Sequence, residues 1–177
     1  MPSGKFHDVV TLLLTPAAFG AGIAAFGTLP LAATAAAAFA FGGFMFGPDL
    51  DTVSKQYSRW GIFRFFWLPY RKFFSHRSRW SHGLIFGSLL RSIYFIGVIT
   101  LAAFALAMAW HAAAESAGPE FLSFVGIWQT FGITFREKIG AIYLAAVFGG
   151  LWLGAASHTF TDMAVSYVKT GRITEFL

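Results

Sequence analysis

The chain has 177 residues, of which 56% are hydrophobic and only 12% are charged. Since a soluble domain usually carries about 25% charged residues, this composition indicates an integral membrane protein. The sequence contains no cysteine, which excludes disulfides, thiolate metal sites and cysteine nucleophiles. The net charge of +5 is explained first by membrane topology and contact with anionic membrane lipid, and no nucleic-acid partner is expected.

Four apolar segments are predicted to be membrane-spanning helices, each of which needs roughly 20 residues. They cover residues 8–27, 31–46, 82–112 and 138–168. The second segment is short and could instead be a buried or re-entrant helix. We therefore expect a single all-α, membrane-embedded domain. It is an integral bundle of about four transmembrane helices with a long loop of aromatic and basic residues after the second span. A short interfacial helix is expected over residues 121–131.

The basic residues predict how these spans are oriented. Because the number of spans is even, both termini and the long loop should lie on one side of the membrane. That side holds ten of the 13 Lys and Arg residues, namely Lys5, Lys55, Arg59, Arg64, Arg71, Lys72, Arg77, Arg79, Lys169 and Arg172. The opposite side has only Arg136 and Lys138, so the positive-inside rule places both termini in the cytoplasm. The remaining one, Arg91, lies inside the third span, where it could pair with another polar group or take part in function.

Residues able to bind a metal ion occur at or near one end of every predicted span. Since the spans alternate in direction, these ends all lie at the cytoplasmic level of the bundle. Polar residues at membrane depth are usually functional, so their convergence predicts a metal site there. The predicted metal ligands are His7, Asp49, Asp51, His76, His82, His158 and Asp162.

The spacing of these residues indicates how they could share an ion. His158 and Asp162 are four residues apart, which places them on one face of a helix. Pro48 discourages helix continuation, so Asp49 and Asp51 should lie in a loop or turn, where they could chelate an ion or bridge two. Imidazole combined with carboxylate suits Zn, Mn or Fe(II) better than Mg or Ca. We expect a divalent metal ion as cofactor, with Zn favoured over Mn or Fe, and one or two ions.

Each of these signals also has an ordinary explanation. A single histidine at the end of a span is commonly an interfacial residue, and the two aspartates could pair with nearby arginines. The loop that follows them interleaves Arg and Lys with aromatic residues, which is typical of an interfacial segment. Its arginines could also bind a lipid phosphate. The loop aromatics include Trp60, Phe65, Phe66, Trp67, Tyr70, Phe73 and Phe74.

Four motifs occur in order along the chain: "MPSGKFHD", "GPDLDTVS", "YRKFFSHRSRWSHG" and "ASHTFTD". They resemble a family of small bacterial membrane proteins, common in cyanobacteria, that are predicted to bind metal and have no known function. That family is similar to the YdjM-like inner-membrane metal-dependent hydrolases. The resemblance implies that the seven predicted ligands bind metal or lie close to it, in a bacterial plasma (inner) membrane or a thylakoid membrane. The third motif departs from the broader group, which has Thr and Ser where Trp80 and Gly83 stand here.

The expected function is a membrane-embedded metal-dependent hydrolase that acts on a phosphoester or lipid-linked substrate at the cytoplasmic face. Asp8 is predicted to be a general base or a partner that orients a histidine. Arg77 is predicted to take part in catalysis by holding a substrate phosphate, together with Arg79. The alternative is a non-catalytic metal-binding membrane protein, such as a sensor, chaperone or assembly factor. The sequence leaves the substrate, the metal and the oligomeric state open.

Overall fold

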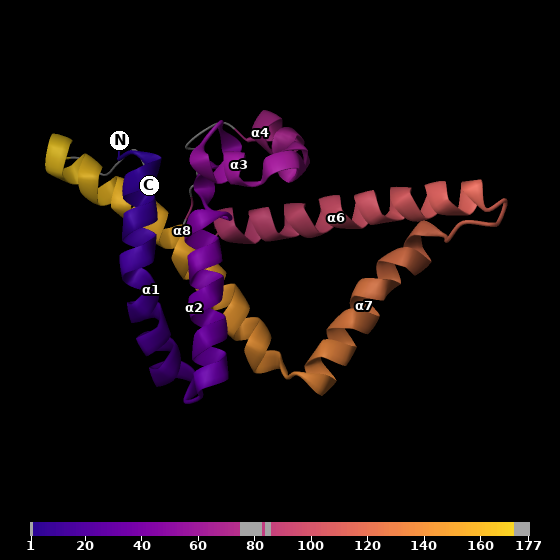
Figure 1. The fold of residues 1–177 in the computed structure, drawn as a ribbon, viewed down its shortest axis with the longest axis horizontal. Helices are drawn as coiled ribbons and strands as arrows, with labels where there is room; N and C mark the ends of the chain where they lie inside the picture. Colours follow the sequence, from indigo (N-terminus) through magenta and orange to yellow (C-terminus); the bar gives the residue numbers. More distant parts are fainter. Residues whose placement is uncertain (1, 75–82, 84–85, 172–177) are drawn as a thin grey trace. The chain divides into compact units, whose positions relative to one another are not determined.

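The structure is a computed structural model that describes residues 2–74, 83 and 86–171. Within these residues all regular structure is helical, which confirms the predicted all-α class. Four helices are long and apolar enough to cross a membrane. They are α1 (Gly4–Phe26), α2 (Leu29–Phe44, with the turn that follows it), α6 (Phe86–Ala113) and α8 (Ala141–Thr170). Each of the four predicted apolar segments overlaps one of them, with ends that differ by up to four residues (Figure 1).

The chain forms two compact units. The first comprises Met1–Arg91 with Ile142–Leu177, and the second comprises Ser92–Ala141. The candidate site lies entirely in the first unit.

Helices α1 and α2 form an antiparallel hairpin (Figure 1). The hydroxyl of Ser3 accepts a hydrogen bond of 3.3 Å from the Phe6 amide and so begins α1. Gly27 ends the helix in the left-handed conformation, with φ of 71°, and its amide donates to the Ile23 carbonyl. The chain then turns directly into α2 through the short "GTLP" connection.

Helix α8 packs against α2 through small residues. A buried cluster of Leu31, Ala35 and Ala146 joins the two helices. Further along, a β-carbon on Gly154 would overlap the carbonyl oxygen of Phe39, so only glycine permits the observed approach of the backbones. Close approach through small residues is the usual way in which helices associate in lipid. It holds α8 against the α1–α2 hairpin.

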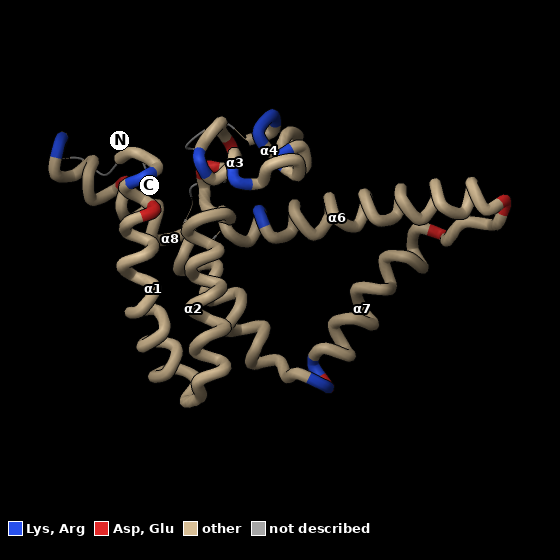
Figure 2. Tube along the Cα trace, viewed as in Figure 1, with Lys and Arg blue, Asp and Glu red and all other residues tan. Residues whose placement is uncertain are grey.

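The aromatic and basic segment after α2 folds into short helical pieces rather than an open loop. These are η1 (Pro48–Asp51), α3 (Lys55–Arg59), η2 (Gly61–Trp67) and α4 (Leu68–Phe73). Trp67 is fully buried and contacts Phe46, Trp60 and Tyr70 edge-on, with ring centroids 5.3 to 5.7 Å apart. The indole of Trp60 also donates to the Met45 carbonyl at 2.9 Å. The segment is therefore anchored to the end of α2, while its Lys and Arg residues lie on α3, η2 and α4 (Figure 2).

The second unit is an α-helical hairpin of its own, built from most of α6 and from α7 (Phe121–Lys138). The Trp128 indole donates to the Thr100 hydroxyl at 2.6 Å, and Phe104 contacts Phe121 and Phe124 edge-on. Helix α7 begins where the interfacial helix is predicted, but it continues for about two further turns, to Lys138.

The Gly154 contact predicts a stability difference between two neighbouring glycines of α8. Gly154→Ala should lower the free energy of unfolding by about 1–3 kcal/mol, because the added methyl group overpacks the contact with α2. Gly149→Ala is the matched control, because its added methyl group meets no atom within 4 Å. Thermal unfolding in detergent, followed by circular dichroism, measures both. Equal midpoints for the two variants would contradict the packing described here.

Candidate metal centre

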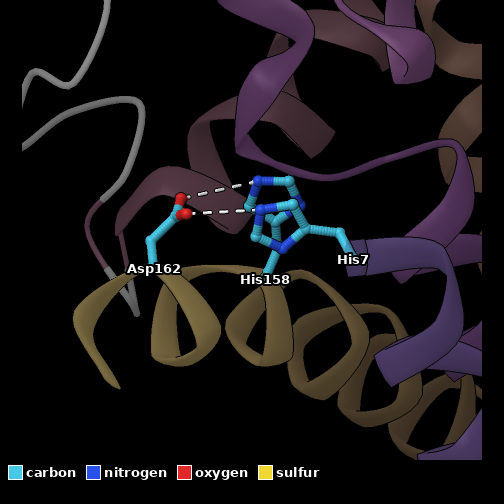
Figure 3. A group of neighbouring side chains, drawn as sticks. All are labelled: His7, His158 and Asp162. Atoms are coloured by element: carbon cyan, nitrogen blue, oxygen red, sulfur yellow. Dashed lines mark ion pairs between the residues drawn. The ribbon is translucent and has the colours of Figure 1, made fainter. Parts of the chain in front are cut away.

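Three predicted ligands from the two ends of the chain meet in the first unit (Figure 3). Nε2 of His7 lies 3.2 Å from Oδ1 of Asp162, and Nε2 of His158 lies 3.6 Å from Oδ2 of the same carboxylate. All three side chains are buried, with 4 to 6% of their surface exposed. We call His7, His158 and Asp162 the triad.

Local structure explains why these side chains converge. Ser3 sets the start of α1, so His7 lies within its first turns. His158 and Asp162 are one turn apart on α8 and face the same way. Gly154 lies one turn before His158, so the close α2–α8 contact fixes the depth at which both α8 side chains lie.

The two imidazole rings of the triad are stacked. Their centroids are 3.6 Å apart and their planes differ by only 9°. Both rings turn an Nε2 atom toward Asp162, as the dashed lines in Figure 3 show. The carboxylate thus faces two nitrogen donors side by side.

Asp49 adds a second carboxylate to this group. It lies in η1, immediately after the end of α2, and its Oδ2 is 3.4 Å from Nε2 of His158. A 3₁₀ helix has about three residues per turn, so Asp49 and Asp51 point in different directions from η1. The two aspartates that the sequence presents as a pair are therefore divided: the structure brings Asp49 to the triad, and Asp51 points elsewhere.

Arg91 is a buried cation near both aspartates of η1. Arg91 is almost completely buried, donates to the Ser88 hydroxyl at 3.1 Å and lies beside Tyr70. Asp51 is itself buried, and both it and Asp49 lie within electrostatic range of the guanidinium. Arg91 thus has polar and acidic neighbours, and pairing with polar groups is one of the two roles that the sequence leaves open for it.

Gln56 is a residue of the site that sequence analysis missed. It is buried, its amide nitrogen donates to the Gly43 carbonyl at 2.7 Å, and the same nitrogen lies 3.5 Å from Nδ1 of His158. A β-carbon on Gly47 would overlap this amide, so glycine there makes room for it. Gln56 supports the back of the His158 ring, and residues behind a ligand commonly set its orientation. No motif marks this glutamine in the sequence.

The structure places Asp8 with cations rather than in the triad. Its carboxylate accepts from Lys55 at 2.9 Å and from Arg59 at 2.7 Å. Adjacent residues on a helix point about 100° apart, so Asp8 diverges from His7. Arg59 also donates to the Phe44 carbonyl, and these contacts tie α3 to the start of α1 and the end of α2.

The remaining predicted site residues lie outside the described part of the chain. They are His76, Arg77, Arg79 and His82. Their assigned roles as metal ligands and phosphate ligands stay predictions.

The donors that the structure assembles fit a divalent metal ion. His158 Nε2, Asp162 Oδ1 and His7 Nδ1 are buried and have no hydrogen-bond partner among the described residues. An unpaired buried polar atom is costly, and coordination of a metal ion at about 2.0–2.2 Å would satisfy such an atom. Nitrogen and oxygen donors together suit Zn, Mn or Fe(II).

A polar pocket of about 240 Å³ opens onto the triad. His7, Asp49 and Asp162 form part of its wall, and Ser54 and Lys55 form another part. Asp49 is the most accessible of the donors, with 23% of its side chain exposed. An ion held by these donors would therefore be reachable by a small molecule.

These contacts predict how metal affinity depends on individual residues. His158→Ala should lower the amount of metal bound per chain, because it removes a donor from the triad. Gln56→Ala should weaken binding by about 10–100-fold, because it removes support behind His158 and leaves the ligands in place. Competition with a chelator, read by elemental analysis, measures both. His111→Ala is the control, since His111 pairs with Ser116 in the second unit; an equal loss of metal in this variant would contradict the site.

Comparison with known proteins agrees with the chemistry of this site. A search of curated proteins and a search of solved structures both find no match. A protein-family model described as "Uncharacterized metal-binding protein (DUF2227)" matches residues 2–172, and so covers the triad, Asp49 and almost all of the chain. The chain therefore belongs to this family of metal-binding proteins.

Proposed function

We propose that the protein is a membrane-embedded metal-dependent hydrolase that acts on a phosphoester of a lipid or lipid-linked substrate at the cytoplasmic face. The observation that carries this proposal is the position of His7 and Asp162 of the triad, with Asp49, in the wall of a polar pocket. A metal site that only stabilised the fold would need no such opening, whereas a catalytic site keeps a position for water or substrate. The volume of about 240 Å³ suits a phosphate group with a small neighbouring group rather than a large ligand.

The distribution of charge supports the membrane part of the proposal. In the first unit, the charged residues gather around the N-terminus, η1, α3, η2, α4, the start of α6 and the C-terminal third of α8 (Figure 2). The rest of the α1–α2 hairpin carries none of these residues. Such a division suits a bundle with one polar end, and the excess of Lys and Arg at that end favours the cytoplasm. The triad then lies at the cytoplasmic level of the plasma or thylakoid membrane.

Each described residue of the site has a role in this proposal. His7, His158, Asp162 and Asp49 would hold the ion, which would act as a Lewis acid and make a bound water nucleophilic at neutral pH. Lys55 lies in the pocket wall, where its ammonium can bind a phosphate oxygen. Asp8 pairs with Lys55, which supports a role for Asp8 in positioning this cation. Arg77 and Arg79 remain predicted phosphate ligands.

An apolar groove beside the triad supports a substrate with a hydrocarbon chain. It has a volume of about 480 Å³, and α1, α8 and Phe39 of α2 line it. Ser157 and Thr161 belong to its lining and directly precede His158 and Asp162 in the chain. A second, smaller pocket of about 170 Å³ shares Ala18 and Phe39 with the groove. An acyl chain in this groove would place its polar head close to the triad.

A second candidate is a non-catalytic metal-binding membrane protein, such as a sensor, chaperone or assembly factor. The burial of the triad favours it, because only 4 to 6% of these side chains is exposed. Activity measurements on the metal-loaded protein separate the two candidates.

The hydrolase proposal predicts metal-dependent turnover of phosphoesters. Protein in lipid nanodiscs, stripped with a chelator and reloaded with Zn, Mn or Fe(II), should release phosphate or alcohol from a panel of soluble and lipid phosphoesters. Lys55→Ala should raise KM by roughly tenfold or more without changing metal content, because a charged hydrogen bond to the substrate is lost. Lys72→Ala, on α4, is the control. Full metal content without turnover on any substrate would favour the non-catalytic candidate.

The groove predicts a preference for substrates with long chains. Ala18→Phe should lower kcat/KM for a long-chain lipid phosphoester by about tenfold, since excluding about two methylene groups costs roughly 1.6 kcal/mol. Hydrolysis of a short soluble phosphoester should not change. Ala24→Phe, at an exposed position of the same helix, should affect neither substrate. If Ala18→Phe slows both substrates equally, the groove does not bind the chain.

A further inference from the structure

The contacts within the triad pair its atoms one to one. Oδ1 of Asp162 pairs with Nε2 of His7 at 3.2 Å, and Oδ2 pairs with Nε2 of His158 at 3.6 Å. The two imidazoles therefore use different oxygens of a single carboxylate. Such an arrangement offers two separate nitrogen–oxygen pairs to metal ions.

The stacking of the rings keeps these two pairs apart. An imidazole binds a metal ion along the lone pair that lies in the plane of its ring. The two planes are 9° from parallel with centroids 3.6 Å apart, and both Nε2 atoms turn toward Asp162 (Figure 3). The two lone pairs thus run side by side and do not meet at a common point. One ion shared by both rings would require the stacked rings to splay apart.

The distances fit one ion for each pair. With donor–metal distances of about 2.1 Å, separations of 3.2 and 3.6 Å correspond to nitrogen–metal–oxygen angles of roughly 100° and 120°. Both angles are near the tetrahedral value. The spacing of 3.6 Å between the rings also matches the ~3.5–4 Å between the ions of two-metal sites.

Asp49 supplies a further donor to only one of these positions. Its Oδ2 lies 3.4 Å from Nε2 of His158, and this separation also fits two donor atoms bound to the same metal ion. The position on His7 lies along the wall of the pocket, where water or substrate can complete it. Two divalent ions exceed the charge of the two carboxylates, so the pair would attract an anionic group such as a phosphoester.

We infer that the centre holds two divalent ions bridged by the carboxylate of Asp162, one on His7 and the other on His158 with Asp49. The inference rests on the proposed metal-dependent function and deepens it. In this arrangement the bridging carboxylate is that of Asp162, whereas the sequence suggests that Asp49 and Asp51 could bridge two ions. A phosphate anion that contacts both ions is then the group that the site is built to bind.

The test is a manganese titration of the metal-free protein in nanodiscs, with bound metal counted by elemental analysis and examined by electron paramagnetic resonance. We expect two Mn²⁺ ions per chain with the spectrum of an exchange-coupled pair. A count of zero would overturn the proposed function itself. A count of one, with the spectrum of an isolated ion, would overturn the two-ion centre and leave the proposed function standing. The wild-type protein alone decides these outcomes.

Variants then test the assignment of each residue. His7→Ala should reduce the count to one and give the spectrum of an isolated ion. Asp162→Ala should abolish the exchange coupling, and coupling that survives this substitution would show that Asp162 is not the bridge. His111→Ala should keep two coupled ions, because this histidine lies outside the triad. Circular dichroism of each variant separates loss of an ion from loss of the fold.

Discussion

A buried carboxylate is the constraint around which the first unit is organised. Asp162 is 4% exposed, on a helix apolar enough to cross a membrane. An unpaired charge in such a place costs several kcal/mol, so other groups must come to it. The structure brings His7 from α1 to one of its oxygens and His158 from its own helix to the other. The close α2–α8 contact, the capped start of α1 and the short turn that carries Asp49 all serve to place these donors.

A second buried charge near η1 also needs polar partners. Arg91 is a buried cation, and its neighbours are a hydroxyl, a phenol and the acidic residues of η1. A four-residue turn thus lies next to two polar environments: Asp49 contacts His158 of the triad, and both Asp49 and Asp51 lie within electrostatic range of Arg91. These neighbours explain why two carboxylates with one residue between them can coexist at the end of an apolar helix.

Part of this site follows from the sequence, and part does not. The alternation of spans predicts that His7, Asp49, His158 and Asp162 share one level, and helical spacing predicts that His158 and Asp162 share one face. The division of Asp49 from Asp51 depends on a 3₁₀ turn, which the sequence does not distinguish from an open loop. The role of Gln56 depends on how α3 returns to α2, a tertiary contact that leaves no local pattern. Trp67 and Tyr70 lie in a segment whose composition is typical of a membrane interface, yet both side chains are buried. The sequence does not reveal this, because membrane interfaces and protein cores favour the same aromatic residues.

The triad joins parts of the chain that are made at different times. His7 belongs to the first long helix and Asp162 to the last one, with both other long helices between them. During synthesis the N-terminal hairpin is complete while α8 does not yet exist, because chains emerge from the N-terminus onward. The centre can therefore take up metal only after the final long helix has been made and packed against α2. Bound metal then indicates that α8 has been made and packed into place. A truncated chain that lacks α8 retains His7 and Asp49 but cannot form the site.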